Sequence, residues 1–238
     1  MDRVILKLSG EALSGDRNAG IDPKKIKDLA LEIKEAQELN LKQIGVVVGG
    51  GNFFRGRDAK DLGMDRIDCD YMGMIGTLLN ALALKDMLLS LGAKVKVLTS
   101  LEVPEAIELY NKEDAINYLE EGNIVIFAGG TGRPLFSTDT AALLKATDIN
   151  AKEILMAKNG VDGVYDDDPK INPNAKKYDI LTHKDVLTNS LQVMDMTAAS
   201  IADTNDIDIV VFDIASKDAI KKAIKNEKIG TLIKKEIK

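Results

Sequence analysis

Three short segments of the chain carry residue types that hold phosphate groups, and each segment directly follows an apolar run. They are Lys7-Leu8-Ser9-Gly10, Gly49-Gly50-Gly51-Asn52-Phe53-Phe54-Arg55 and Gly129-Gly130-Thr131-Gly132-Arg133-Pro134-Leu135-Phe136-Ser137-Thr138-Asp139-Thr140. Glycines let backbone N–H groups approach a ligand closely, and lysine and arginine supply positive charge for phosphate oxygens. The segments therefore predict phosphoryl transfer, a reaction that depends on positioning and charge stabilisation.

The three segments differ in how strongly each one alone indicates function. Lys7–Gly10 taken alone is explained more simply by an ordinary strand followed by a turn. The three consecutive glycines Gly49–Gly51 cost conformational entropy and exceed what a tight turn requires, so they favour a ligand site. In the third segment, Ser137 or Thr138 can cap a helix, with Asp139 favourable in its first turn. Such capping is compatible with an anion site at the same place.

The chain contains one cysteine, Cys69, and one histidine, His183. An intramolecular disulfide, a cysteine-rich zinc site and a multi-histidine metal site are therefore excluded. Any metal would be a hard cation on carboxylate and phosphate oxygens, so we expect Mg²⁺ rather than zinc. The G-x-x-x-x-G-K-[ST] motif is absent, and no G-x-G-x-x-G motif follows a strand, which argues against P-loop and nicotinamide-binding enzymes.

The overall composition limits the partners and the location of the protein. Hydrophobic residues make up 45% and charged residues 29%, values that are ordinary for a soluble globular protein. The formal net charge is -6 without a block rich in lysine and arginine, so a nucleic-acid partner is not expected. The N-terminal run lacks the features of a signal peptide, and no stretch approaches about 18 uninterrupted apolar residues. We expect a cytoplasmic protein without a membrane partner.

Short apolar runs alternate with longer helical patterns along the chain. Strands are predicted at Val4–Leu8, Ile44–Val48, Val95–Leu98, Ile124–Phe127, Glu153–Met156, Ile209–Phe212 and Thr231–Ile233. Helices are predicted over residues 23–40, 66–91, 114–120, 138–147, 197–204 and 217–225 and near Asp185, and the turn-rich residues 160–177 predict a hairpin with loops. This alternation predicts one α/β domain over residues 1–238, a three-layer αβα sandwich with a mainly parallel central sheet. Ligands of such sheets bind beyond the carboxyl ends of the strands.

A further candidate is Asp70, at the start of the long helix predicted over residues 66–91. A carboxylate at this position can accept hydrogen bonds from the vicinal hydroxyls of a sugar. An equally simple interpretation is a solvated acid in the first helical turn, where the helix dipole favours negative charge.

The order of the motifs resembles that of the bacterial UMP kinases, a branch of the amino-acid-kinase family. The matching segments are Lys7–Leu13, Gly49–Gly56, Asp70–Met74, Thr131–Asp139, Val161–Tyr165 with Asp168-Pro169, and Val193–Asp195. The resemblance covers essentially the whole chain and implies the amino-acid-kinase fold. It also implies transfer of the γ-phosphoryl group of ATP to UMP, giving UDP and ADP in pyrimidine nucleotide biosynthesis. A requirement for Mg²⁺, a homohexamer, activation by GTP and inhibition by UTP are further implications of the same resemblance.

The resemblance also assigns roles to individual residues. The residues implied to contact ATP are Lys7, Leu8, Ser9, Gly10, Gly51, Arg55, Asn159, Tyr165 and Asp168. The residues implied to bind UMP are Gly50, Asp70, Thr131, Gly132, Arg133, Pro134, Leu135, Phe136, Ser137 and Thr138, with Asp70 on the ribose. Lys7, Arg55 and Asp139 are the implied catalytic residues, and no residue is assigned as a direct metal ligand. The implied GTP-response loop comprises Gly15, Asp16, Arg17, Asn18, Ala19 and Gly20.

Some positions depart from the family pattern. Arg133 stands where many members have asparagine, which adds a charge to the acceptor loop, and Asn159 stands where others have threonine. The neighbouring Lys158 is displaced relative to some members, and its role stays open. Two alternatives also stay open. An amino-acid kinase that forms an acylphosphate would have no use for a ribose-binding Asp70, and a non-catalytic nucleotide-binding protein of the same fold need not retain Lys7.

Overall fold

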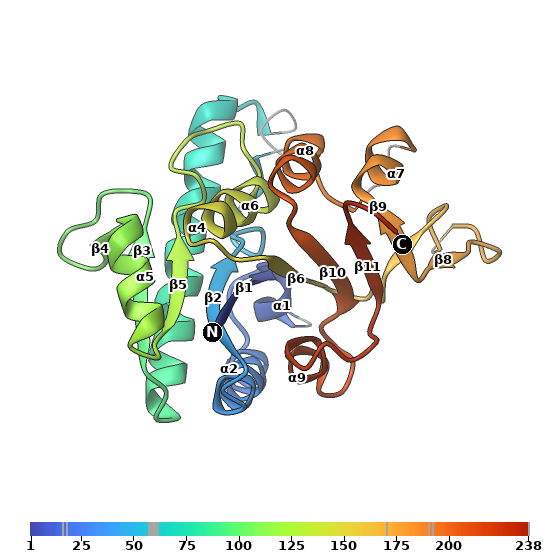
Figure 1. The fold of residues 1–238 in the computed structure, drawn as a ribbon. Coiled ribbons are helices and arrows are strands. Elements are labelled where there is room, and N and C mark those ends of the chain that lie inside the picture. The colour runs from blue at the N-terminus through green and yellow to red at the C-terminus, as the bar shows by residue number, and fades with distance from the viewer. Residues whose placement is uncertain are drawn as a thin grey trace.

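The computed structural model describes residues 1–15, 17, 19–56, 62–169, 171–189, 191 and 193–237. Within these residues, a nine-stranded sheet with the order β4-β3-β5-β2-β1-β6-β10-β11-β9 runs through the protein (Figure 1). Its strands are β1 (Asp2–Leu8), β2 (Lys42–Val48), β3 (Val95–Thr99), β4 (Glu108–Leu109), β5 (Ile124–Ala128), β6 (Glu153–Lys158), β9 (Ile180–Thr182), β10 (Asp208–Asp213) and β11 (Thr231–Lys234). Its pairings are parallel except that of β10 with β11, so the predicted mainly parallel sheet is confirmed.

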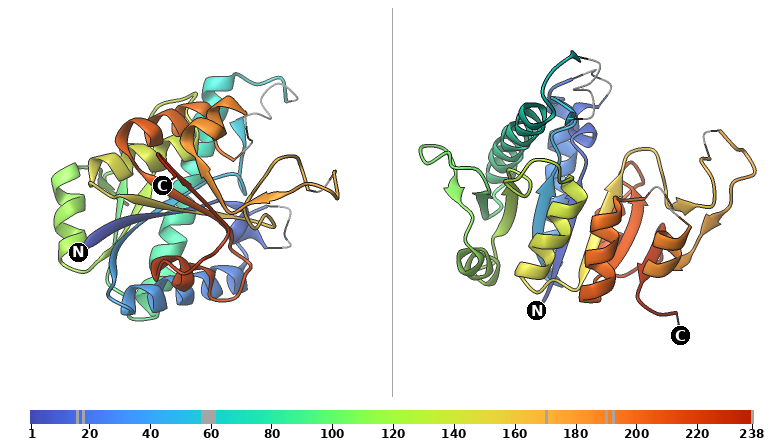
Figure 2. Two further views of the ribbon diagram at one scale, coloured as in Figure 1. Left: turned by 45° about the vertical axis from the view of Figure 1, so that its right-hand side comes forward. Right: turned by 90° about the horizontal axis from the view of Figure 1, so that it is seen from above.

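Helices cover both faces of this sheet (Figure 2). They are α1 (Glu11–Ser14), α2 (Pro23–Glu38), α4 (Arg66–Ser90), α5 (Lys112–Glu120), α6 (Thr138–Asp148), α7 (His183–Thr188), α8 (Met196–Asn205) and α9 (Ala219–Ile224). One buried apolar cluster joins α2, α4 and α9 to the sheet, and a second joins α5, α6, α7 and α8 to the other face. In β1, Val4 and Leu6 belong to the first cluster and Ile5 to the second, as expected for a strand that is buried on both faces. The three-layer αβα prediction is confirmed.

Some elements differ from the sequence prediction. The short elements α1, β4 and β9 were not predicted, because runs of two to four residues carry no readable periodicity. The helix predicted from Lys217 begins only at Ala219, where Asp218 takes a left-handed backbone with φ 57°. The predicted hairpin is present as the antiparallel pair β7 (Val164–Tyr165) and β8 (Lys177–Tyr178), which projects beside the sheet (Figure 1).

The helix α4 is long and apolar enough to cross a membrane by length and composition alone. Of its most apolar window, however, 44% is buried inside the protein. Its buried residues, among them Leu84 and Leu88, belong to the apolar cluster that covers one face of the sheet. In this fold α4 therefore acts as a core helix.

Side-chain caps fix where the helices near the strand ends begin. The Asp65 carboxylate accepts hydrogen bonds from the N–H groups of Ile67 and Asp68 at the start of α4. The Ser137 hydroxyl accepts from the N–H groups of Asp139 and Thr140 at the start of α6. Such a cap stabilises a helix by about 1 kcal/mol. The capping sequence therefore places Asp139 in the first turn of α6.

The position of β1 decides where a ligand can bind. It pairs in parallel with β2 on one side and with β6 on the other. The chain therefore leaves β1 toward β2 and later returns to add β6 to its opposite edge. In open α/β sheets this reversal of strand order opens a crevice at the carboxyl ends of the strands. Lys7 and Lys158 lie near the ends of two of these strands.

Candidate active site

A cavity of about 740 Å³ opens at this edge of the sheet. It is lined by residues from all three segments that were predicted to hold phosphate groups. Of the residues predicted from the sequence, the lining includes Lys7, Ser9, Gly50, Gly51, Arg55, Asp70, Arg133, Leu135, Phe136, Ser137, Thr138, Asp139 and Asn159. A volume of this size is within the range of small-molecule sites. The fold thus brings together side chains that are far apart in the sequence.

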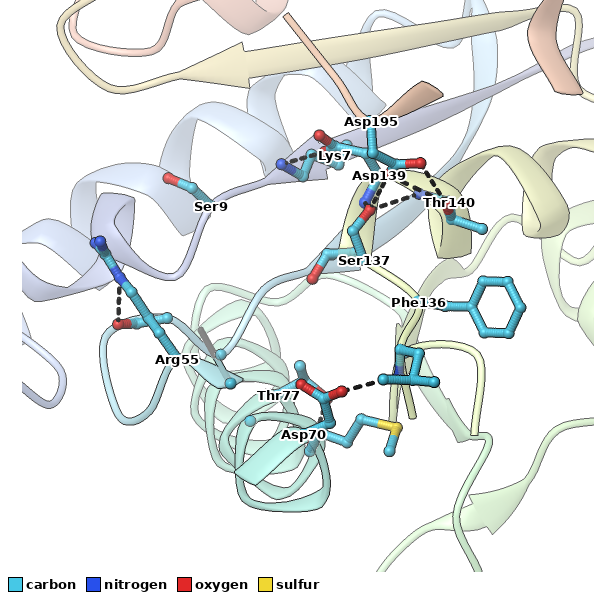
Figure 3. A pocket seen from close by; sticks show the side chains of 18 of the residues that line it. Lys7, Ser9, Arg55, Asp70, Thr77, Phe136, Ser137, Asp139, Thr140 and Asp195 are labelled. Carbon is cyan, nitrogen blue, oxygen red and sulfur yellow. Dashed lines mark hydrogen bonds and ion pairs between the residues drawn. The ribbon is translucent and has the colours of Figure 1, made fainter. Parts of the chain in front are cut away.

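Lys7 and Asp139 line the cavity and form an ion pair with each other (Figure 3). The Lys7 Nζ atom lies 2.6 Å from Asp139 Oδ1, and the two side chains are only 9% and 14% exposed. Burial acts to raise the pKa of the Asp139 carboxyl, but the charges of Lys7 and Lys158 outweigh burial and hold this pKa below its usual value. The carboxyl is therefore ionised at neutral pH.

Lys158 is a second, half-buried ammonium that interacts with the same carboxylate. Burial lowers its pKa, with the charge of Asp139 acting in the opposite sense and the charge of Lys7 adding to the lowering. Its Nζ atom donates a hydrogen bond to the carbonyl oxygen of Val193 at 2.5 Å. When both lysines are protonated, Lys7 and Lys158 exceed the single negative charge of Asp139 and can attract a phosphoryl group.

The glycine loop after β2 packs directly on α4. A Cβ atom added at Gly50 would come within 2.2 Å of the Gly73 carbonyl oxygen, so only glycine fits there. The carbonyl oxygen of Gly50 accepts hydrogen bonds from the N–H groups of Phe53 and Phe54, at 2.9 and 3.1 Å. Gly50 is therefore required for helix packing, a role that the sequence did not distinguish from close approach to a ligand.

Arg55 follows this loop at the rim of the cavity. Its guanidinium forms an ion pair with Glu11, and its Nε atom donates to the carbonyl oxygen of Gly51 at 3.4 Å (Figure 3). Glu11 belongs to α1, immediately after the first predicted segment. The pair therefore connects the first two segments at the mouth of the cavity.

Asp70 connects α4 to the loop that precedes α6. Its Oδ1 atom accepts from Arg66 Nε and its Oδ2 atom from the Leu135 N–H, both at 2.8 Å (Figure 3). Leu135 has a positive φ of 70°, which is costly for a residue with a side chain, and the bond to Asp70 helps to hold it. Asp70 is only 13% exposed, so it is not merely a solvated acid of the first helical turn.

Asp195 was part of a matching motif, but it was not predicted as a site residue. Its carboxylate accepts hydrogen bonds from the Ser137 hydroxyl and, at 3.0 Å, from the Thr140 hydroxyl (Figure 3). It also caps α8 by accepting from the N–H of Ala198 at 2.9 Å. Asp195 therefore holds the starts of α6 and α8 together at the cavity wall. The Val193-Met194-Asp195 motif was the signal that pointed to it.

Several predicted residues lie outside the cavity lining. They are Leu8, Gly10, Thr131, Gly132, Pro134, Tyr165 and Asp168. Leu8 is fully buried in the core, and the Thr131 hydroxyl accepts from the Arg133 N–H at 3.1 Å and so shapes the loop from within. Tyr165 donates to Asp162 in the hairpin region at 2.6 Å. Their contacts with nucleotides stay predictions.

The described residues of the predicted GTP-response loop also do not line the cavity. Asp16 and Asn18 lie outside the described residues. Arg17 is exposed near Asp22, with Arg17 Nε 3.6 Å from Asp22 Oδ2. Gly15 has a φ of 57°, and Ala19 and Gly20 complete the described part of this segment. The allosteric role of this loop stays a prediction.

The cavity contains further residues that the sequence did not single out as site residues. They are Glu11, Phe54, Gly56, Arg66, Gly73, Met74, Thr77, Gly130, Thr140, Val161, Asp195, Met196 and Thr197. Most of them are ordinary helix or turn residues whose types carry no chemical signal. His183 and Cys69 are buried and do not line the cavity, so neither can serve as a nucleophile or base there.

The oxygen donors of the cavity fit a divalent cation that arrives with a nucleotide. Among the described residues, no group of three or more His, Cys, Asp or Glu side chains could hold a metal ion. Four carboxylates line the cavity, those of Glu11, Asp70, Asp139 and Asp195, and of these Asp139 lies beside Lys7. Mg²⁺ commonly binds one or two carboxylates together with substrate phosphates and waters, and this donor set is compatible with that mode.

The fold and the site together define a phosphotransferase that acts on nucleotides: glycine loops and lysines meet at the carboxyl ends of a parallel sheet, without a histidine or cysteine nucleophile. The model of the amino acid kinase family matches residues 2–213, and the chain belongs to this family.

Relatives within the family are similar to the chain over its whole length. The uridylate kinase of Pediococcus pentosaceus is 50% identical over 98% of this chain and 97% of the relative. That of Limosilactobacillus reuteri is 51% identical over 98% and 96%. Among solved structures, the UMP kinase from Bacillus anthracis has a TM-score of 0.95 at 37% identity, covering 99% of this chain and 97% of the other. The UMP kinase from Ureaplasma parvum has a TM-score of 0.92 at 38% identity, covering 98% and 99%. The resemblance to the bacterial UMP kinases is confirmed.

Proposed function

We propose that this chain is a UMP kinase, which transfers the γ-phosphoryl group of ATP to UMP and releases UDP and ADP in pyrimidine nucleotide biosynthesis. The observation that carries the proposal is one cavity that is lined jointly by the Lys7–Asp139 pair, the glycine loop and Asp70. Full-length relatives named uridylate kinase support the same conclusion.

The reaction needs charge stabilisation more than an activated side chain. An oxygen of the UMP phosphate attacks the γ-phosphorus of ATP, and the bond from this phosphorus to the bridging oxygen breaks as ADP leaves. A phosphate monoester has a second pKa near 6, so the acceptor is ionised at neutral pH and needs no general base. Lys7 neutralises the transferred group, and Arg55 binds phosphate oxygens at the rim. Asp139 holds Lys7 in place.

The two nucleotides would share this cavity. On the acceptor side we assign Gly50, Asp70 and the loop Thr131–Thr138, with Asp70 on the ribose. On the donor side we assign Lys7–Gly10, Gly51, Arg55, Asn159, Tyr165 and Asp168. These assignments follow the family motifs and agree with the lining of the cavity wherever the two overlap.

The remaining features implied by the family are also proposals. Mg²⁺ would enter with ATP near Asp139 and Asp195, and it would supply charge neutralisation for the phosphates. A homohexamer is compatible with an exposed apolar stripe on α4, formed by Ile67, Tyr71, Ile75 and Leu79. GTP activation, UTP inhibition and a cytoplasmic location complete the proposal. We further propose that residues 1–238 act as one domain, because strands from both halves share one sheet.

A panel of nucleoside monophosphates with ATP and Mg²⁺ tests the function through ADP release. We expect turnover with UMP and slower turnover with CMP, because the acceptor loop must read the uracil edge. Turnover with acetylglutamate and none with UMP would instead support an acylphosphate-forming kinase. Nucleotide binding without any turnover would support a non-catalytic protein.

A further inference from the structure

A pair of buried amide side chains lies outside the cavity, next to the glycine loop. Asn52 follows Gly49–Gly51 directly, and Asn80 lies within α4; they are 4% and 0% exposed. The Asn52 Nδ2 atom donates to Asn80 Oδ1 at 3.0 Å, and Asn80 Nδ2 donates to Asn52 Oδ1 at 2.7 Å. Neither residue lines the cavity, so their contacts are with the protein itself.

The second N–H of each amide binds a backbone carbonyl. Asn80 Nδ2 donates to the Gly49 oxygen at 2.7 Å, and Asn52 Nδ2 donates to the Gly20 oxygen at 2.8 Å. The Gly20 N–H in turn donates to the Asn52 carbonyl oxygen at 2.9 Å. A side-chain amide has two N–H donors, so every N–H donor of the two side chains has an acceptor. The pair therefore joins α4, the glycine loop and the segment that ends at Gly20.

We propose that Asn80 is a positioning residue that, through Asn52 and the Gly49 carbonyl, sets the glycine loop in the geometry that phosphate binding requires. A buried amide is costly unless its hydrogen bonds are satisfied, and a satisfied buried network specifies one arrangement. The loop tolerates little displacement, because Gly50 packs closely on Gly73 of α4 and Gly10 packs against Asn52. This inference rests on the proposed function, since it concerns the same phosphate-binding loop.

Kinetics of two variants of the same helix test the proposal. Asn80→Leu removes the amide and keeps a side chain with the same branching and the same number of non-hydrogen atoms, whereas Leu84→Ala removes core packing of α4 and leaves the Asn52–Asn80 hydrogen bonds in place. Both are measured at a temperature at which circular dichroism shows them folded. We expect kcat/KM for UMP to fall roughly 10- to 100-fold in Asn80→Leu, because a displacement of about 1 Å is enough for such a loss. Leu84→Ala should retain the wild-type value. Equal kinetics of Asn80→Leu and wild type would overturn the proposal.

Hydrogen exchange gives a readout that does not depend on activity. Exchange of the N–H groups of Gly20, Phe53 and Phe54, which are bonded to Asn52 or Gly50, should accelerate in Asn80→Leu relative to the rest of α4. In Leu84→Ala these groups should keep their protection relative to the helix. If the wild-type protein does not phosphorylate UMP, the proposed function fails, whereas the exchange experiment still decides the role of Asn80. Unchanged protection in Asn80→Leu would refute it.

An isosteric variant covers the case in which Asn80→Leu does not fold. Asn80→Asp keeps the volume but replaces both donors by acceptors that face the oxygens of Gly49 and Asn52. We expect reduced activity and faster exchange at neutral pH. Protonation of the new carboxyl restores one donor, so the ratio of variant to wild-type activity should rise toward acidic pH. A ratio that does not change with pH, together with unaltered exchange, would argue against the positioning role.

Discussion

The Nζ atom of Lys7 and the Oδ1 atom of Asp139 lie 2.6 Å apart, and this ion pair joins the end of β1 to the first turn of α6. Lys158 adds a second ammonium close to the same carboxylate, and burial and the charge of Lys7 lower its pKa. The carboxylate therefore organises positive charge at the point where the glycine loop and the acceptor loop meet.

Replacement of Lys7 by alanine should abolish most of the turnover. The variant loses the charge that stabilises the transferred group, so we expect kcat to fall by about 10² to 10³ or more. The fold should stay intact, because the uncovered Asp139 faces a cavity that water can enter. Steady-state ADP release and circular dichroism measure the two effects. Lys24→Ala, at an exposed position of α2, is the control and should behave like the wild type. An unchanged rate in Lys7→Ala would remove Lys7 from the mechanism.

Replacement of Asp70 by alanine should impair the acceptor side alone. The variant loses a carboxylate that can accept from the ribose hydroxyls, and it releases the Leu135 N–H from its present acceptor. We expect KM for UMP to rise on the order of 10- to 100-fold, with little change in KM for ATP. Preference for UMP over 2′-deoxy-UMP should also decrease. Arg66→Gln is a useful comparison, because it removes the partner of Oδ1 but keeps the carboxylate. An equal rise in KM for UMP and for ATP would contradict a contact of Asp70 with the UMP ribose.

Replacement of Arg133 by asparagine tests the charge in the acceptor loop. Arg133 lines the cavity, and its backbone is held by the Thr131 hydroxyl. Removal of the guanidinium should raise KM for the anionic UMP several-fold and weaken the dependence of this KM on salt concentration. The loop itself should be retained, because Thr131 contacts only the backbone of Arg133. The test is to measure KM for UMP from low to high salt concentration in the variant and in the wild type. An identical salt dependence in the two proteins would exclude a role of the Arg133 charge in UMP binding.

Because of Lys145, the free energy of unfolding is expected to change with pH in the alkaline range. It is buried, and its Nζ atom lies 3.0 Å from the centroid of the Tyr110 ring, which offsets part of the cost of burying the charge. Burial lowers its pKa from 10.5 to about 8, although the Asp148 carboxylate acts in the opposite sense. Below pH 8 Lys145 is protonated in both states, and the folded state bears the full free-energy cost of burying its charge. Between pH 8 and 10.5 only the unfolded chain still binds the proton, so the free energy of unfolding rises.

Lys145→Met should therefore stabilise the protein at pH 7 by about 1–3 kcal/mol and should remove part of the rise above pH 8. Denaturant unfolding at several pH values measures this. Lys96→Met is the matched control, because Lys96 also lies over a tyrosine ring, that of Tyr118 at 4.6 Å, but is exposed. If the two variants shift stability alike at every pH, burial of Lys145 is not the cause.

Much of the fold could be read from local patterns in the sequence. The buried strands are continuous apolar runs, and the caps at Asp22, Asp65 and Ser137 mark where helices begin. The short strands β4 and β9 could not be predicted, because their pairing partners rather than their own residues define them. The four-residue helix α1 is too short to show a periodicity. The antiparallel direction of β11 is likewise set by its contact with β10.

The sequence by itself determined the chemistry of this protein: glycines, lysines and an arginine at strand ends, in a chain with a single histidine and a single cysteine. Only the tertiary structure decided which of these groups face one another. It paired Lys7 with Asp139, turned Asp70 toward Leu135, brought Asp195 to Ser137, and placed the buried Asn52–Asn80 pair behind the glycine loop. The physical reason is that local propensity acts over a few residues, whereas these contacts depend on the strand order and on the packing of helices against the sheet.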